Sequence, residues 1–389
     1  MKPLTFMLIA GEASGDALGA ELIQALRQRL GGREAKFFGV GGPQMQAAEM
    51  ELIFDFTRNA VFGLEAIKRL WEFRQRFKRL LQLAIEREPD AIICVDFAGF
   101  NRRFAHAVRE HGRQAKSSKW KPKIIQYVSP QVWASRPRRA DKMAKDIDLL
   151  LAIFPFEKAW YAQRTPQLHV EFVGHPIIDR YDSQVPTADK PFNAEAPLIV
   201  LLAGSRPTEL KKHLPVMRET LRLIRTEIPN TRAVMVLSDR LAALARQIGL
   251  PENVEVHSSL PDALARADVA IAKSGTVTLE CAYFGVPTVT LCKMPAVTYA
   301  IAKRIVQLKW VAMPNILANE EVFPEFVQSK ATAENIARST LELMHDAGRR
   351  TTVKAKLRQI AASLGQPGAS GRAAAEIMKL LVQDESGPK

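Results

Sequence analysis

The chain has 389 residues and 47% hydrophobic side chains, which is typical of a globular protein with more than one hydrophobic core. Its three cysteines are an odd number without a C-x-x-C pair, which argues against a disulfide framework or a zinc site and favours a reducing cytoplasm. The formal net charge of +14 favours anionic partners, such as nucleic acid, anionic lipid or phosphorylated substrates.

Short apolar runs alternate with amphipathic segments along the first half of the chain. The strands that this pattern predicts are 6–10, 36–40, 91–95, 124–128, 149–153 and 170–173. Such alternation is typical of a parallel sheet with helices on both faces. The first run is too short for a signal peptide and leads directly into Glu12 and Asp16, so we interpret it as a strand. No run approaches the ~18 to 20 apolar residues that span a bilayer, so any membrane contact is expected to be peripheral.

A proline-rich segment without periodicity, 182–197, separates this half from a second series of predicted strands. These are 198–203, 233–237, 254–257, 269–272 and 288–292. The sequence therefore predicts an α/β fold of two Rossmann-like domains, 1–181 and 198–365, joined by the linker. We expect the helical tail 366–389 to pack back on the first domain, and a cleft to lie at the carboxyl ends of the strands.

The loop after the first predicted strand carries the sequence A-G-E-A-S-G-D. Glycines at a strand-to-helix turn let a ligand approach the backbone N–H groups at the positive end of a helix dipole, which suits a phosphate or a sugar. A plain helix cap by Ser14 or Asp16 is the alternative. Glu12 is not needed for capping, so Glu12, Ser14 and Gly15 are candidate site residues.

Two strands of the first domain end in further candidates. Asp96 ends an apolar strand in line with the expected cleft, where burial would raise its pKa toward that of a general base. The alternative for Asp96 is a helix cap or a structural hydrogen bond to Asn101. His175, beside Pro176, is either a ligand for a phosphate or sugar, or a structural histidine.

In the second domain, Arg206 follows a predicted strand and a Gly-Ser turn, and Pro207 suits a first helical position. A guanidinium there can hold a diphosphate through two parallel hydrogen bonds, whereas a solvated surface arginine is the alternative. The seven histidines lack ligand spacing, and neither H-E-x-x-H nor Asp-x-Asp occurs. We therefore expect no metal and no other cofactor.

A third loop joins the strand 269–272 to a helix that Gly285 closes. Ser274, Gly275 and Thr276 offer N–H and hydroxyl donors for phosphate oxygens, and Glu280, one turn later, can accept from both hydroxyls of a ribose. This combination resembles the nucleotide-sugar donor site of GT-B glycosyltransferases. By contrast, G-V-G-G-P-Q-M at 39–45 does not match the dinucleotide-binding G-x-G-x-x-G, which disfavours a Rossmann dehydrogenase.

Segments along the whole chain are together similar to the lipid-A-disaccharide synthase family. They are LIAGEASGDALGAELI, FFGVGGPQMQAA, IIQYVSPQVWASR, FPFEKAWY, FVGHPIID, LLAGSRPTEL, AIAKSGTVTLE and MPNILA. The resemblance implies a metal-independent, inverting GT-B transferase of lipid A biosynthesis. It would join UDP-2,3-diacylglucosamine to 2,3-diacylglucosamine 1-phosphate (lipid X), giving the β-1,6-linked disaccharide 1-phosphate and UDP.

The same resemblance implies roles for the candidates. The first domain would bind the acceptor, with Asp96 as the general base and Glu12 beside it. Further acceptor-side residues would be Ser14, Gly15, Asn101 and His175. The second domain would bind UDP through Arg206, Ser274, Gly275, Thr276, Glu280 and Asn315.

This chain departs from the family pattern at three places. Gly99 stands where the family usually has a second acidic residue, so Asp96 would act without that neighbour. Ser135 replaces the usual tryptophan, and Glu65 lies one position early.

Residues 63–85 predict a basic amphipathic helix, which would bind an anionic bilayer surface. The alternative is an ordinary helix packed on the sheet with a solvated basic face. Cationic residues at 135–145 and 299–310 would add to the attraction. We therefore expect a peripheral protein on the cytoplasmic face of the inner membrane, and the resemblance suggests a homodimer.

Two other functions fit parts of the sequence. A UDP-N-acetylglucosamine 2-epimerase or a soluble GT-B enzyme would keep the fold, but the basic helix and the match at 129–133 argue against it. A noncatalytic protein that binds RNA or anionic lipid would use the charge. Because no RNA-binding motif is recognisable, we expect no nucleic-acid partner.

Overall fold

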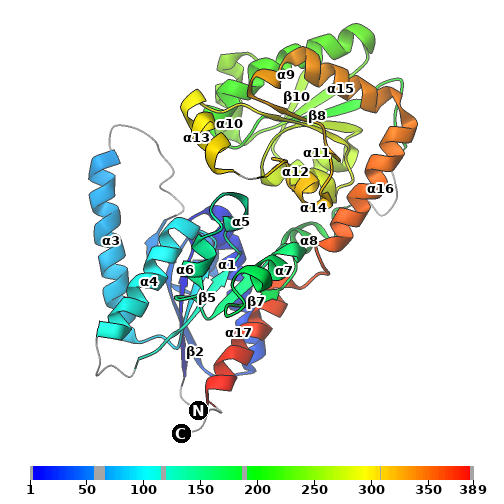
Figure 1. Cartoon of the computed structure of the whole chain (residues 1–389). Coiled ribbons are helices and arrows are strands. Elements are labelled where there is room, and N and C mark those ends of the chain that lie inside the picture. The colour runs from blue at the N-terminus through cyan, green and yellow to red at the C-terminus, as the bar shows by residue number, and fades with distance from the viewer. Residues whose placement is uncertain (1–2, 57–65, 115–119, 186–190, 307, 386–389) are drawn as a thin grey trace. The chain divides into compact units, whose positions relative to one another are not determined.

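The chain folds into two compact units in the computed structural model (Figure 1). The first contains Met1–Pro176 and Gly365–Lys389, and the second contains Ile177–Leu364. The chain thus leaves the first unit and returns to it at the end. The residues that the structure describes are 3–56, 66–114, 120–185, 191–306 and 308–385.

The first unit is built on a parallel sheet of seven described strands in the order β3-β2-β1-β4-β5-β6-β7. Its strands are β1 (Leu4–Ile9), β2 (Ala35–Gly41), β3 (Glu51–Asp55), β4 (Ala91–Val95), β5 (Lys123–Tyr127), β6 (Leu149–Ala152) and β7 (His169–Phe172). Central strands such as β4 are buried on both faces, which explains their uninterrupted apolar sequences.

Helices connect these strands, and α17 (Ala369–Glu385), the last helix of the chain, also belongs to this unit. They are α1 (Ala13–Leu30), α2 (Pro43–Ala47), α3 (Ala66–Arg87), α4 (Ala98–Gln114), α5 (Val132–Ser135), α6 (Arg139–Met143), α7 (Pro155–Arg164) and α17 (Ala369–Glu385). The α1 helix ends at Gly31, whose left-handed backbone, with φ 56°, suits a residue without a side chain.

The second unit has a parallel sheet of six described strands in the order β10-β9-β8-β11-β12-β13. These strands are β8 (Leu198–Leu202), β9 (Arg232–Val236), β10 (Val254–His257), β11 (Val269–Lys273), β12 (Thr288–Cys292) and β13 (Glu325–Val327). Both sheets are parallel and helix-connected, so the predicted α/β class is confirmed.

The second unit begins with α8, which we had expected to belong to the first. Its other helices surround the sheet, and a short 3-10 helix follows β13. The helices are α8 (Ile177–Tyr181), α9 (Pro207–Glu227), α10 (Asp239–Ile248), α11 (Leu260–Arg266), α12 (Thr276–Tyr283), α13 (Ala296–Ile305), α14 (Met313–Ala318), α15 (Ala333–His345) and α16 (Ala347–Ser363).

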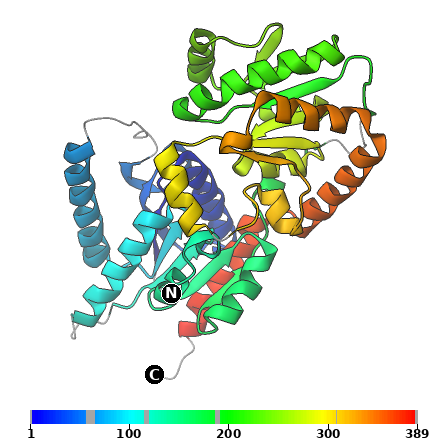
Figure 2. The same cartoon turned by 45° about the horizontal axis from the view of Figure 1, so that its top comes forward.

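The carboxyl-terminal helix α17 packs on the first unit in both views of the molecule (Figures 1 and 2). It lies against α1 and the end of β5. Its contact face consists of small and aliphatic side chains that are fully buried: Ala369, Ala373, Ala374 and Ile377. Hydrogen bonds fix it further, among them those from Arg372 Nε to Val173 O at 2.7 Å and from Arg29 Nε to Gly371 O at 3.1 Å.

Each sheet reverses its strand order at one place. In the first sheet β1 pairs with both β2 and β4, and in the second β8 pairs with both β9 and β11. Ligands of open parallel sheets bind outside the carboxyl ends of the strands at such a switch point. The loops after β1 and β4, and those after β8 and β11, are therefore the places to look for a site.

Candidate functional site

The loop after β1 brings Glu12 to the amino-terminal end of α1, where it is the N-cap residue with extended backbone. Its side chain is exposed and caps no N–H of the helix. Ser14 is exposed as well, and Gly15 is buried. A Cβ at Gly11 would lie 2.4 Å from the ring of Phe97, so this glycine lets the loop approach the residue that follows Asp96.

Asp16 has a role that the sequence did not reveal. Its buried carboxylate accepts hydrogen bonds from the backbone N–H groups of Gly42 at 2.8 Å, Gln44 at 3.0 Å and Met45 at 3.0 Å. These groups open α2, so Asp16 caps a neighbouring helix and not its own. Asp16 therefore ties the loop after β1 to the loop after β2.

Asp96 lies at the end of β4 with left-handed backbone, as does Phe97, at φ 47° and 43°. Such φ values are strained for residues with side chains and recur at functional sites. Burial raises the pKa of the Asp96 carboxyl, and the nearby charge of Glu12 raises it further. Sequence candidates from two different loops, Glu12 and Asp96, thus act on each other electrostatically.

Asn101 holds the strand ends around Asp96. Its fully buried amide donates to the carbonyl oxygens of Asp96 at 2.8 Å, Ile9 at 3.3 Å and Val95 at 3.4 Å. The alternative predicted for Asp96, a structural hydrogen bond to Asn101, is thus present, although Asn101 bonds to the backbone carbonyl of Asp96 and not to its carboxylate. Among the described residues, Asn101 Oδ1 has no partner. Gly99 is exposed, and a Cβ there would meet no atom within 4 Å.

The segment after β5 is anchored by a carboxyl that sequence analysis missed. Glu157 on α7 is fully buried and accepts from Trp133 Nε1 at 2.9 Å and from the backbone N–H of Phe154 at 3.1 Å. Burial raises the pKa of Glu157 to about 7. His175, also buried, stacks obliquely on Phe154 with a 5.2 Å separation of ring centroids.

In the second unit, Arg206 is the exposed N-cap residue of α9. The loop before it is fixed by Glu209, which accepts from the backbone N–H of Ser205 at 3.1 Å and pairs with Lys273 Nζ at 3.1 Å. Because Lys273 ends β11, this ion pair joins the loops after β8 and β11. Sequence analysis named Arg206 but not the Glu209–Lys273 pair that links the loops.

The loop after β11 has the donor groups that the sequence predicts. Gly275 is the N-cap of α12 with φ 153°, and Thr276, the first helical residue, is exposed. Ser274 Oγ donates to the carbonyl oxygen of Val311 at 2.9 Å, so this hydroxyl already has a partner. The free N–H groups of a helix start and its positive dipole end favour an anion here.

Glu280 is mostly buried and accepts a hydrogen bond from Tyr181 Oη at 2.8 Å. Arg180 lies 4.0 Å from the same oxygen, and burial raises the pKa of the Glu280 carboxyl despite both neighbours. A ribose at this position would share the carboxylate with Tyr181. Sequence analysis missed this partner, because Tyr181 lies 99 residues away in the chain.

Asn315 is fully buried, and its amide is used within the fold. It donates to Phe323 O at 2.7 Å and to Glu325 Oε1 at 2.8 Å, and it accepts from the N–H groups of Val322 and Phe323. Its side chain therefore holds the segment before β13 and has no polar group left for UDP in this conformation. This differs from the role that we predicted.

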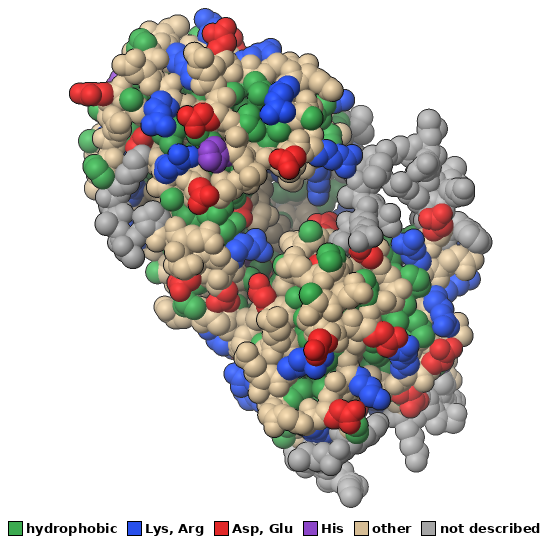
Figure 3. All heavy atoms as spheres, turned by 180° about the vertical axis from the view of Figure 1, so that it is seen from behind, with side chains coloured by type: hydrophobic (Ala, Val, Ile, Leu, Met, Phe, Trp, Pro, Cys, Tyr) green, Lys and Arg blue, Asp and Glu red, His purple; other side chains and the backbone are tan. Residues whose placement is uncertain are grey.

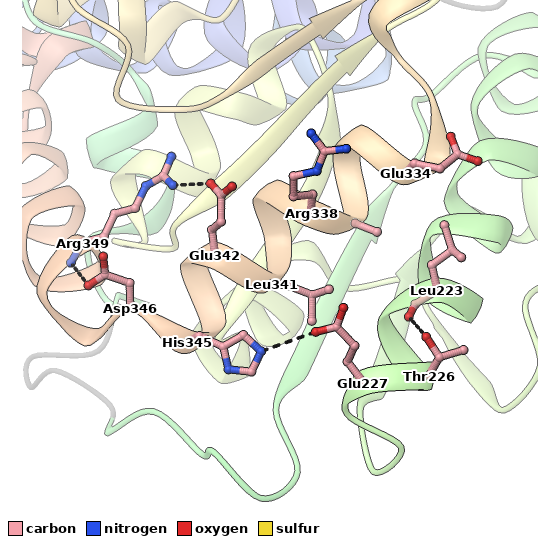
Figure 4. Close-up of a pocket in the computed structure, with 11 residues that line it drawn as sticks. Leu223, Thr226, Glu227, Glu334, Arg338, Leu341, Glu342, His345, Asp346 and Arg349 are labelled. Atoms are coloured by element: carbon pink, nitrogen blue, oxygen red, sulfur yellow. Dashed lines mark hydrogen bonds and ion pairs between the residues drawn. The ribbon is translucent and has the colours of Figure 1, made fainter.

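A cavity of about 890 Å³ lies between α9 and α15 in the second unit (Figure 4). Two pairs of side chains meet in its wall: His345 Nε2 lies 3.9 Å from a carboxylate oxygen of Glu227, and Arg349 pairs with Glu342 at 2.6 Å. Of the predicted site residues, all of which the structure describes, none lines this cavity. We therefore do not place the predicted site there.

The described residues contain no group of three or more His, Cys, Asp or Glu side chains that could hold a metal ion. Within the same part of the chain, no helix is both long and apolar enough to cross a bilayer.

Comparison with solved structures defines the class. The glycotransferase of kitacinnamycin aligns with a TM-score of 0.61 and 19% identity over 98% of this chain and 100% of its own. A putative UDP-N-acetylglucosamine 2-epimerase from Listeria monocytogenes gives 0.65 with 16% identity, over 100% of this chain and 99% of its own. At such identities the likeness shows the fold alone, which is that of a GT-B enzyme.

Sequence comparison gives the family. The model of the lipid-A-disaccharide synthetase family matches residues 6–378, and the chain belongs to that family. The lipid-A-disaccharide synthase of Trichlorobacter lovleyi is 33% identical over 98% of this chain and 99% of its own, and that of Nitrosococcus oceani is 34% identical over 97% and 96%. The prediction of a glycosyltransferase of lipid A disaccharide synthesis is thereby confirmed.

Proposed function

We propose that this enzyme transfers the sugar of UDP-2,3-diacylglucosamine to the 6-hydroxyl of 2,3-diacylglucosamine 1-phosphate with inversion, and that Asp96 is the general base. The observation that carries the assignment of the base is the environment of Asp96. It ends the central strand β4 at the switch point of its sheet, is half-buried, and has a raised pKa. A raised pKa makes a carboxylate a stronger base for a hydroxyl proton.

In the proposed reaction Asp96 takes the proton of the acceptor hydroxyl as that oxygen forms a bond to the anomeric carbon of the donor. The bond from this carbon to the UDP oxygen breaks, and UDP leaves with the electron pair. Asn101 supports the step by holding the backbone of Asp96, and Glu12 supports it by raising the pKa of Asp96. Ser14, Gly15 and His175 are proposed to contact the acceptor.

The donor side of the proposal uses the second unit. The helix start at Ser274–Thr276 and the guanidinium of Arg206 are proposed to hold the diphosphate, and Glu280 the ribose. Negative charge grows on the diphosphate as UDP leaves, and a helix dipole and a fixed cation stabilise such charge. We propose that these groups suffice without a metal ion.

We further propose that the enzyme works on the cytoplasmic face of the inner membrane, as a peripheral protein and a homodimer. Both substrates carry acyl chains, so access to a bilayer surface is required. The part of the predicted basic helix that lies at 63–65 is outside the described residues. The described remainder, α3, has cationic side chains at Arg74, Lys78 and Arg79 that are exposed.

The test is product formation from the two lipid substrates in detergent with EDTA, for the wild type, Asp96→Asn and Asp141→Asn. Asp141 is an exposed carboxylate of the same unit and serves as the control. A positioned general base contributes ~10²- to 10⁴-fold, so turnover should fall by that factor in Asp96→Asn alone. If EDTA abolishes turnover by the wild type, the proposal of metal independence is refuted. If Asp96→Asn remains fully active, the assignment of Asp96 as the general base is refuted.

A further inference from the structure

The first unit contains a second cavity, of about 360 Å³, between α4 and α6. These two helices run beside each other in Figure 1. The cavity wall is strongly basic: Arg102, Arg103 and Arg113 come from α4, Lys142 comes from α6, and Lys145 from the turn after it. None of the residues that we predicted for catalysis or UDP binding lines it.

Most of this charge has no acidic partner among the described residues. The acidic side chain in the wall, Asp146, accepts from His106 Nδ1 at 3.1 Å. Arg113 pairs with Glu110 on its own helix. For the other four cations, Arg102, Arg103, Lys142 and Lys145, the described part of the chain provides no carboxylate within ion-pair distance.

Two further arginines, Arg136 and Arg139, add positive charge near Arg102 and Arg103. The pKa of Arg139, at the start of α6, is lowered by partial burial and by the charges of Arg136, Arg102 and Arg103. Cations that lower the pKa of a neighbouring arginine repel it, and the repulsion destabilises the fold. On the face shown in Figure 3, by contrast, Lys and Arg side chains are interspersed with Asp and Glu.

An anion in the cavity would remove this repulsion. Guanidinium groups match tetrahedral phosphate oxygens through paired N–H donors, and a lysine adds a point charge. A volume of about 360 Å³ admits a phosphate group with its immediate substituent, and is at the lower end for small-ligand sites. We infer that the cavity between α4 and α6 is a binding site for a phosphate group.

If the proposed function holds, a phosphate group that enters this cavity has two sources. One is the headgroup of an anionic phospholipid. The other is the 1-phosphate of the acceptor, because Arg102, the first lining residue on α4, stands six residues after Asp96 in the chain. The binding of phosphate itself does not depend on the proposed function, whereas the assignment to the acceptor does. The cavity is therefore tested first with inorganic phosphate.

The experiment is calorimetric titration of inorganic phosphate into the whole protein, with saturating UDP to block the predicted diphosphate site. Arg103→Gln/Lys142→Gln removes two exposed cations of the cavity. Lys36→Gln/Lys121→Gln removes the same charge from exposed positions of the first unit that do not line it. We expect phosphate affinity to fall ~10-fold or more in the cavity variant and to be nearly unchanged in the control. No binding to the wild type, or equal losses in both variants, would overturn the inference.

Two further measurements on the same variants identify the source. Weaker binding of the cavity variant to phosphatidylglycerol vesicles, at unchanged binding to phosphatidylcholine, assigns the cavity to lipid headgroups. A raised KM for the acceptor at an unchanged KM for the UDP-sugar assigns it to the acceptor phosphate. A wild type that binds phosphate but transfers no sugar would refute the proposed function and leave the cavity site intact.

Discussion

Asp96 links the geometry of the site to a measurable pH dependence. Its pKa is raised by burial first and by Glu12 second, and a general base acts only when deprotonated. Lowering the pH should therefore decrease kcat/KM. We expect the midpoint of this decrease to lie at a higher pH than an ordinary aspartate would give. The measurement is kcat/KM from about pH 4 to 8 in mixed micelles.

The matched variants for this profile are Glu12→Gln and Glu34→Gln, the second at an exposed position of the same unit. Removing the charge of Glu12 removes one cause of the raised pKa, so the acid limb should move to lower pH in that variant alone. An acid limb that stays in place in Glu12→Gln would contradict the coupling.

The raised pKa of Glu157 predicts that the stability of the protein also depends on pH. Its pKa is about 7 in the folded protein against an ordinary value of 4.5, so between these values the folded chain retains a proton that the unfolded chain loses. The free energy of unfolding therefore falls as the pH rises through this window, by roughly 3 kcal/mol, and then levels off.

Urea unfolding of the wild type and of Glu157→Gln, followed at several pH values, isolates this effect. Glutamine does not titrate, so the stability difference between wild type and variant should shrink from about pH 4.5 to 7. A difference that is constant with pH would contradict the raised pKa of Glu157.

The residues of the candidate site differ in how far they could be predicted. Glu12, Asp96 and Arg206 lie within three residues of the ends of predicted apolar runs, so these strand ends could be located from the sequence alone. Partners such as Trp133 for Glu157 come from segments that only the fold brings together. Hydrogen bonds of this kind leave no periodicity in the sequence.

At the scale of the elements, the short helix α2 depends on one side chain from another helix. Asp16 accepts three N–H groups at the start of this five-residue helix, which is too short to be stable by itself. We expect Asp16→Ala to lower the free energy of unfolding by about 1 to 3 kcal/mol, because it leaves buried donors unpaired. Denaturant unfolding measures this loss. Glu34→Gln is the control, and an equal effect there would argue against the cap.

Strand prediction located most strands of both sheets, including the edge strands β7 and β10, but missed the other edge strand of each sheet. The runs 91–95, 254–257 and 288–292 match β4, β10 and β12 residue for residue. The edge strands β3 and β13 were missed. Both are short, and their side chains are mostly half-buried, so neither a continuous apolar run nor a clear alternation marks them.

At the scale of the whole molecule, α17 makes the first unit depend on the end of the chain. Deleting residues 365–389 would expose the apolar surface now covered by Ala373, Ala374 and Ile377, and would remove the hydrogen bonds of Arg372. We expect the first unit to lose several kcal/mol of stability. The second unit, which contains none of these residues, should be unaffected.

Limited proteolysis with mass spectrometry separates the two units in this experiment. Cleavage in the truncated chain should begin within residues 1–176 at temperatures where 177–364 is still protected. A shorter deletion of residues 386–389 is the matched control. Equal loss of protection in both units of the truncated chain would contradict the assignment of α17 to the first.

The returning helix also determines the order in which the protein is completed during translation. A nascent chain emerges from its amino end at about 5 to 20 residues per second and folds as its segments become available. The ribosome has synthesised every residue of the second unit before α17 exists, while the first unit still lacks the helix that covers α1. The unit that is synthesised first is therefore finished last, and the uncovered side of α1 is the surface that a chaperone at the ribosome would meet.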